Sequence, residues 1–358
     1  QGLVRTFARE VSGVESRLVD VDPAAGPDAV GAALVAELRT AEAPTEVGVS
    51  GGGRRTLTTE PRPLDADAGI ESGTTEDRDL GAGSVVVITG GARGIGGRLA
   101  VGLARTTGCG VELIGRSPLP GPEPADLTGA ADEVAVRQAI IRRGEHTRPA
   151  DIEAATARAL ADREIRATLA ALADHAAFVH YRSLDVRDGA ALTAALDEIR
   201  HQRGRLDGVV HAAGVREDKL IRDKTPESFA RVFATKATSA QVIAEAVGDR
   251  GFAVFFASVS GWFGNAGQVD YAAANAALDA IARRARRTAP GSRLVAIDWG
   301  PWAGTGMVSP ELAREYQRRG IGLIDPDLGV AAALAELRAG VPDPQVVVMC
   351  ASVESLGG

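Results

Sequence analysis

Val85-Val86-Val87-Ile88-Thr89-Gly90-Gly91-Ala92-Arg93-Gly94-Ile95-Gly96 is the stretch that decides the fold. Its four consecutive apolar residues, Val85 to Ile88, are typical of a parallel strand buried on both faces. The glycines follow that strand and precede a predicted helix at 98–105, the context in which a glycine-rich loop binds a dinucleotide. Glycine lets backbone amides approach a pyrophosphate, and the helix N-terminus adds free N–H groups. The sequence therefore predicts a cofactor loop made of Thr89, Gly90, Gly91, Arg93, Gly94, Ile95 and Gly96.

Strand-like apolar segments recur after this loop, with helical stretches between most of them. Alternation of strands and helices predicts an α/β fold with a doubly wound parallel sheet. The predicted strands are residues 85–88, 111–115, 178–186, 208–211, 253–258, 294–298 and 345–349.

The chain divides into a small N-terminal unit, a linker and a catalytic unit. Residues 1–60 predict a partial structural subdomain, an α/β run without a phosphate loop. Residues 61–84 are rich in Pro, Asp, Gly, Thr and Glu, which is typical of a linker, and 85–358 form the predicted dinucleotide-binding domain. Because the chain starts with Gln inside a predicted helix, we expect it to be a piece of a longer polypeptide. The N-terminal elements are predicted as a helix at 3–11, a strand at 17–21, a helix at 28–39 and a strand or hairpin at 46–59.

One connection is longer than a crossover requires. A crossover between parallel strands needs about a dozen residues or somewhat more, whereas 118–177 is about sixty residues long. It predicts two helices, 126–143 and 149–174. They form either an insert packed on the edge of the sheet or a docking surface for a neighbouring domain.

Composition excludes several classes of protein. The 358 residues contain 45% hydrophobic residues, enough for a sizeable core, and the net charge of −7 argues against a nucleic-acid-binding surface. Cys109 and Cys350 form no metal or disulfide motif, so we expect two reduced, buried cysteines and no metal. The absence of a membrane-length apolar run or a signal peptide predicts a cytoplasmic protein without a membrane partner.

The residues after the second predicted strand indicate which dinucleotide is bound. An acidic residue there would favour NAD, but the sequence has Gly115-Arg116-Ser117, and Arg93 lies inside the glycine loop. Guanidinium groups match a phosphate, so a 2′-phosphate and therefore NADPH is predicted. His211 lies in a predicted buried strand, which indicates a structural hydrogen bond. Further predicted cofactor contacts are Ser117, Asp185 with Val186, and the small residues Ala212, Ala213 and Gly214.

Four residues predict a catalytic site. Tyr271 and Asn275 are four residues apart and so share one helical face. Ser258 ends a predicted strand thirteen residues before Tyr271, and Lys236 lies further upstream on a predicted helix. The residues alone do not decide between Ser258 and Ser260, and Lys224 is a weaker rival of Lys236.

Several blocks resemble, in order, the ketoreductase domains of type I polyketide synthases and polyunsaturated-fatty-acid synthases, which belong to the short-chain dehydrogenase/reductase superfamily. Ordinary short-chain dehydrogenases have Tyr-x-x-x-Lys, whereas these domains have Tyr-x-x-x-Asn with an upstream lysine. The resemblance covers residues 85–350, and Pro301 and Trp302 enter the predicted cofactor site through it. The matching blocks are His211-Ala-Ala-Gly-Val215, Phe256-Ala-Ser-Val-Ser260, Gly267-Gln-Val-Asp-Tyr271-Ala-Ala-Ala-Asn275 and Asp298-Trp-Gly-Pro-Trp302.

The resemblance implies reduction of a β-ketoacyl thioester on an acyl carrier protein, with neighbouring synthase domains as further partners. Tyr271 would be the general acid, with its pKa lowered by Lys236, and the Ser258 hydroxyl would bind the carbonyl oxygen. Asn275 would hold Lys236 or a relay water. Two alternatives are a catalytically silent domain of a megasynthase and a free-standing dehydrogenase.

The resemblance also gives an expectation for stereochemistry. The Leu-Asp-Asp motif associated with the 3R alcohol aligns with Arg216-Glu217-Asp218, where Asp218 is retained, while the Trp of the opposite type would fall near Phe263, one place from Trp262. We therefore expect the 3R product. Residues 303–323, with a helix predicted at 309–319, suit either a mobile lid or a plain surface helix.

Overall fold

The structure is a computed structural model. It describes residues 1–41, 44–51, 53–61, 80–248, 251–289, 291, 293–304, 308, 310–338 and 343–351. Most of the predicted linker, residues 62–79, lies outside the described residues, as do residues 305–307 and 309 of the predicted lid.

The main sheet confirms the predicted doubly wound fold. Within the described residues its order is β11-β9-β8-β7-β4-β5-β6, with every pair parallel. The chain winds outward from β4 in both directions, so a topological switch point lies between β4 and β7, where such sheets bind ligands. Each of the seven strands predicted between residues 85 and 349 belongs to this sheet: β4 (Val85–Thr89), β5 (Gly110–Gly115), β6 (Val179–Ser183), β7 (Gly208–His211), β8 (Phe252–Ser258), β9 (Arg293–Trp299) and β11 (Gln345–Val348).

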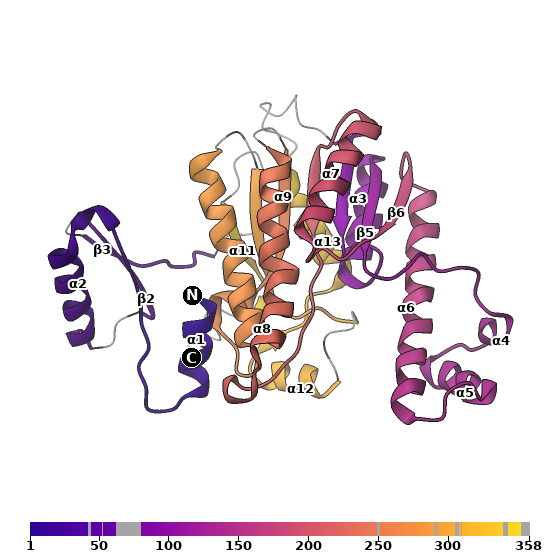
Figure 1. The fold of residues 1–358 in the computed structure, drawn as a ribbon, viewed down its shortest axis with the longest axis horizontal. Coiled ribbons are helices and arrows are strands. Elements are labelled where there is room, and N and C mark those ends of the chain that lie inside the picture. The colour runs from indigo at the N-terminus through magenta and orange to yellow at the C-terminus, as the bar shows by residue number, and fades with distance from the viewer. Residues whose placement is uncertain are drawn as a thin grey trace.

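Helices cover both faces of the sheet (Figure 1). Two apolar clusters separate the layers, because alternate strand residues point to opposite faces. Val86 and Ile88 belong to one cluster, and Val85 and Val87 belong to the other. On the first face lie α3 (Gly94–Thr107), α6 (Pro149–Ala173) and α13 (Pro326–Arg338); on the second lie α7 (Gly189–Arg203), α9 (Ser239–Val247) and α11 (Val269–Thr288).

The N-terminal residues form a small separate sheet with its own helix, and a further helix that packs on the catalytic unit. Figure 1 shows α2 with β2 and β3 at one side, while α1 lies against α11. In the small sheet β1 pairs with β2 in parallel and β2 pairs with β3 in antiparallel. The elements are α1 (Gly2–Glu10), β1 (Leu18–Val21), η1 (Pro23–Ala25), α2 (Pro27–Arg39), β2 (Glu46–Ser50) and β3 (Gly53–Arg55).

The long connection between β5 and β6 contains three helices. The single helix predicted at 126–143 is wrong: the chain breaks into α4 (Ala125–Thr128) and α5 (Glu133–Arg143). The break is local, because the Asp132 carboxylate accepts from the Ala135 N–H at 2.8 Å and so caps a new helix. The α4–α5 pair packs on the first half of α6 through its own apolar cluster, whereas Ile165 and Leu172 of α6 join the sheet's core.

The segments that border the site complete the fold. They are η2 (Ile221–Asp223), α8 (Pro226–Phe233), η3 (Ala234–Thr238), α10 (Val259–Phe263), α12 (Pro310–Arg318), β10 (Ile321–Gly322) and β12 (Cys350–Ala351). Of the cysteines, Cys109 is buried as expected, but Cys350 is exposed because it lies on a short edge strand. None of the helices in the described part of the chain has both the length and the apolar character needed to cross a membrane.

Candidate active site

A cavity of about 750 Å³ lies at the carboxyl ends of the central strands. This volume is typical of a ligand pocket. Residues of the glycine loop and the predicted catalytic residues Ser258, Tyr271 and Lys236 all line it, so the structure brings most of the predicted site together. The predicted residues that line it are Gly90, Arg93, Gly94, Ile95, Gly96, Arg116, Ser117, Val186, Ala212, Ala213, Gly214, Lys236, Ser258, Tyr271, Pro301 and Trp302.

The glycine loop is shaped to approach a ligand with its backbone. A Cβ added at Gly96 would lie 2.4 Å from the Gly90 carbonyl oxygen, and one added at Gly90 would lie 2.8 Å from the Ala213 nitrogen. Gly90 and Gly94 also have positive φ values of 71° and 54°, which favour glycine. The N-terminus of α3 has no side-chain cap, so its N–H groups remain available to an anion. These residues fit the pyrophosphate of a dinucleotide.

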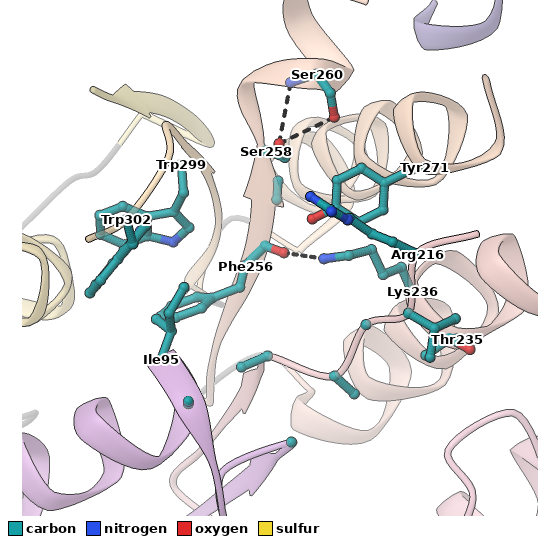
Figure 2. A pocket seen from close by; sticks show the side chains of 18 of the residues that line it. Ile95, Arg216, Thr235, Lys236, Phe256, Ser258, Ser260, Tyr271, Trp299 and Trp302 are labelled. Atoms are coloured by element: carbon teal, nitrogen blue, oxygen red, sulfur yellow. Dashed lines mark hydrogen bonds between the residues drawn. The ribbon is translucent and has the colours of Figure 1, made fainter. Parts of the chain in front are cut away.

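Tyr271 projects from the first turn of α11 toward the end of β8 (Figure 2). Burial raises the pKa of its phenol, and the positive charge of Arg216 and the polar side chains of Asn275 and Ser258 oppose that rise. The net shift is therefore opposite to the predicted lowering, because desolvation outweighs the groups that favour the phenolate. The phenol stays protonated at neutral pH.

Ser258 is oriented by its neighbour Ser260. The Ser258 oxygen accepts from the Ser260 N–H at 3.3 Å and from the Ser260 hydroxyl at 3.2 Å. Having accepted twice, the Ser258 hydroxyl has its own proton to donate. Both serines line the cavity, and of the two it is Ser258 that acts to lower the pKa of the Tyr271 phenol.

Lys236 lies in η3, a π-helical turn between α8 and α9. Such turns are frequent at functional sites. Its side chain is 4% exposed, and its ammonium donates to the Phe256 carbonyl oxygen at 2.5 Å. The Nζ atom lies 5.5 Å from the centre of the Tyr271 ring, over its face. Burial lowers the pKa of Lys236 to about 8, although Asp298 and Asp279 act to raise it.

His211 has the structural role expected from the sequence. Its Nδ1 atom lies 2.6 Å from the Thr89 hydroxyl, and its Nε2 atom lies 2.8 Å from the Ser239 hydroxyl and 3.1 Å from the Lys236 carbonyl oxygen. Burial lowers the pKa of His211 to about 3, so the ring is neutral. It ties the strand before the glycine loop to the turn that carries Lys236.

Three buried side chains, Asn275, Asp279 and Asp298, complete the polar surroundings of the site. Asn275 donates to the Tyr271 carbonyl oxygen at 2.7 Å instead of to Lys236, and its Oδ1 atom has no hydrogen-bond partner among the described residues. Asp279 follows on the same face of α11, and Asp298 on β9 accepts from Gln345 at 2.7 Å. Burial raises the pKa of Asp298 to about 7.

Five predicted site residues do not line the cavity: Thr89, Gly91, Asp185, Asp218 and Asn275. The Thr89 hydroxyl is bound to His211, and the Asp185 carboxylate is paired with Arg187 at 2.5 Å. Asp218 accepts from the Gln268 side chain at 3.0 Å. Any contact of these three with a ligand therefore stays a prediction.

Several side chains in the cavity wall were not predicted from the sequence, and Arg216, Phe256 and Trp299 are three of them. Arg216 lies beside Tyr271 (Figure 2) and is the charge that most favours its phenolate. Phe256 and Trp299 line the cavity with ring centres 5.4 Å apart. Alternation along the strand predicts that Phe256 shares a face with Ser258. Arg216 carries no such signal, because Asp218 is the residue of its motif that matches the family.

A family model described as "KR domain" matches residues 84–304, more than half of the chain. The chain therefore belongs to the KR (ketoreductase) domain family. Its likeness to solved structures agrees: the ketoreductase PlmKR1, from the first module of phoslactomycin biosynthesis in Streptomyces sp. HK803, has a TM-score of 0.74 at 27% identity, with 99% of this chain and 70% of that chain covered.

Similar sequences are parts of much larger proteins. A component of the polyunsaturated fatty acid synthase from Thraustochytrium sp. is 32% identical over 364 residues, which cover 97% of this chain and 12% of that protein. Erythronolide synthase EryA3 from Saccharopolyspora erythraea is 31% identical over 350 residues, which cover 97% of this chain and 9% of that protein. The chain thus spans about a tenth of these relatives.

Proposed function

We propose that this domain uses NADPH to reduce a β-ketoacyl thioester, carried on an acyl carrier protein, to the 3R β-hydroxyacyl thioester. The observation that carries the proposal is the convergence of Tyr271, Ser258 and Lys236 on one cavity that residues of the glycine loop also line (Figure 2). Its setting would be a polyketide or polyunsaturated-fatty-acid synthase, as in the relatives.

Bound nicotinamide would supply the hydride that the ketone carbon receives. The backbone N–H groups at the start of α3 would hold its pyrophosphate, and Arg93 and Arg116 would bind a 2′-phosphate. Both guanidinium groups line the cavity, and neither is ion-paired within the described part of the chain. Trp302 also lines the cavity, and its buried indole N–H has no partner among the described residues, so it is available as a hydrogen-bond donor.

Tyr271 would donate a proton to the carbonyl oxygen as negative charge develops there. A phenol held protonated by burial is suited to be that acid. The Ser258 proton would hydrogen-bond the same oxygen, and the Arg216 charge would stabilise the phenolate left behind. Lys236 would favour the same state through its charge over the ring.

The proposal is tested with purified protein, NADPH and a β-ketoacyl thioester mimic. NADPH consumption coupled to appearance of the hydroxyacyl product is the expected result. A protein that binds NADPH without turnover would instead be a catalytically silent domain, and one that does not bind NADPH would overturn the cofactor assignment as well.

Arg116→Asp is expected to weaken NADPH binding about 10- to 100-fold and to leave NADH binding nearly unchanged, because charge-assisted bonds to the 2′-phosphate are lost. Fluorescence titration with both nucleotides measures this. Arg98→Asp is the matched control, since Arg98 is an exposed arginine on α3 that does not line the cavity. Equal losses for the two nucleotides would remove the 2′-phosphate assignment.

The rate of ketone reduction is expected to fall as pH rises through about 8, where Lys236 loses its proton. A lysine whose pKa is lowered keeps its charge only below that lowered value, so the loss comes earlier than for a free lysine. The Tyr271 pKa is raised above its ordinary value of 10.0 and does not contribute in this range. The measurement is kcat between about pH 6 and pH 10.

Asp298→Asn tests the assignment of that pH limb. The Asp298 carboxylate raises the pKa of Lys236, so its removal should move the fall in kcat to lower pH. A limb that stays in place, or a flat wild-type profile, would contradict the role given to Lys236.

Support for the 3R product comes from the substrate side of the cavity. Phe263 lines the cavity, whereas Trp262 is not part of the lining. The Arg5 guanidinium carbon lies over the Trp262 ring, 4.6 Å from the ring centre. Asp218 keeps its place in the motif associated with that product. Chiral analysis of the alcohol formed decides the point.

A further inference from the structure

Helix α1 is seated against the catalytic helix. A Cβ added at Gly2 would lie 2.1 Å from the Ala272 carbonyl oxygen, next to Tyr271, so only glycine allows this approach. Thr6 is fully buried, and its hydroxyl accepts from the Asn265 N–H at 3.3 Å. Arg9 donates to the Phe263 carbonyl oxygen at 2.8 Å. The polar face of α1 thus follows residues 263–267, several of which line the cavity.

The last residue of α1, Glu10, joins two loops of the catalytic unit. Its Oε1 atom accepts from the Gly267 N–H at 2.8 Å, and its Oε2 atom accepts from the Ile221 N–H at 2.7 Å. Gly267 is four residues before Tyr271, and Ile221 is three residues after Asp218. One carboxylate therefore accepts a hydrogen bond from a backbone N–H of each of two loops, the loop before Tyr271 and the loop after Asp218.

These two loops also contact each other directly. The Lys219 N–H donates to the Gly267 carbonyl oxygen at 2.8 Å, and the Gln268 side chain donates to Asp218. Lys224 and Asp270 form an almost fully buried ion pair at 2.7 Å. Glu10 contacts both of these loops from outside the catalytic unit.

The position of Glu10 indicates that its carboxylate stabilises the two loops and does not stabilise its own helix. A negative charge at a helix C-terminus is unfavourable, since the helix dipole is negative there. Glu10 is the final residue of α1, yet both of its oxygens are engaged by backbone donors more than two hundred residues away in the chain. Charge-assisted bonds of this kind are stronger than neutral ones.

We infer, on the basis of the proposed function, that Glu10 is a positioning residue that fixes both loops beside Tyr271 and so sets how the ketoacyl chain meets the catalytic groups. The glutamate acts through Gly267 and Ile221 and does not touch the reacting atoms. It lies outside the region that matches the KR family.

Glu10→Gln is the decisive variant. The amide side chain keeps the shape but offers one acceptor, and its NH₂ group opposes the second N–H. We expect kcat/KM for the thioester to fall about tenfold and the ratio of 3R to 3S product to decrease, because a small misplacement of reacting groups is costly. The Kd for NADPH should stay within about twofold of wild type, because the glycine loop is untouched. Glu15→Gln is the control, since the Glu15 side chain is 87% exposed.

Amide hydrogen exchange at Gly267 and Ile221 provides a readout that does not depend on turnover. Exchange at both amides should become faster in Glu10→Gln and stay unchanged in Glu15→Gln. If wild-type protein shows no turnover, the proposed function fails, while the exchange result still tests whether Glu10 holds the Gly267 and Ile221 amides in place. Unchanged kcat/KM with unchanged exchange overturns the inference, as does a parallel loss of NADPH binding, which would indicate general destabilisation. If Glu10→Gln does not fold, Glu10→Asp, which reaches at most one amide, is tested with the same readouts.

Discussion

Tyr271→Phe is expected to lower kcat by about 10²- to 10⁴-fold, the range that general acid catalysis contributes. The ring would still fill its place on α11, and only the proton donor would be lost. Binding of NADPH should change little, because the substitution leaves the glycine loop, which would hold the pyrophosphate, untouched. Single-turnover rates and a nucleotide titration measure the two effects separately.

Tyr316→Phe is the matched comparison for this variant. Tyr316, on α12, also lines the cavity, and burial raises the pKa of its phenol as well. Its loss should cost much less, because Tyr316 is not the tyrosine under the Lys236 ammonium. If Tyr316→Phe is the damaging change and Tyr271→Phe is mild, the general acid has been assigned to the wrong tyrosine.

Gly96→Ala is expected to weaken NADPH binding about 10²-fold. The new methyl group would lie 2.4 Å from the Gly90 carbonyl oxygen, a backbone atom that cannot rotate away. Relief of such overpacking costs about 1–3 kcal/mol, and a tenfold change in affinity corresponds to about 1.4 kcal/mol. The loop would have to shift and would no longer present its amides to the pyrophosphate.

Two further glycine variants separate the causes. Gly94 has a φ of 54° and open space around its Cβ position, so Gly94→Ala tests backbone strain without a clash. Gly31→Ala, in α2 with open space, should leave binding unchanged. Isothermal titration of the three variants should rank Gly96→Ala as the weakest binder; wild-type affinity in Gly96→Ala would show that the loop is not the cofactor site.

The inner strands of the main sheet were predictable because they are short apolar runs that are buried along most of their length. The edge strands β6 and β11 are only partly buried. The long helix at 126–143 was predicted incorrectly for a physical reason. Apolar spacing continues across Gly129–Asp132, and only the capping bond of Asp132 shows that a second helix starts there. Local capping chemistry outweighed the periodic signal.

The candidate site was predictable as a set of residues but not as a set of energies. The glycine loop follows from its place between a strand and a helix, whereas the choice of Ser258, Tyr271 and Lys236 rests on the family resemblance. All three side chains line one cavity with residues of that loop. The direction of the Tyr271 pKa shift did not follow, since it depends on how far the phenol is removed from water. The π-helical turn at Lys236 and the contacts of Glu10 were also invisible, because each is set by tertiary packing.

The reach of Glu10 has a practical meaning for chimeric synthases. The KR family match starts at residue 84, which makes that position a natural place to join domains from different assembly lines. A junction there would leave the two substrate loops facing a foreign helix, whereas a junction before Gly2 would transfer α1 together with the loops it holds.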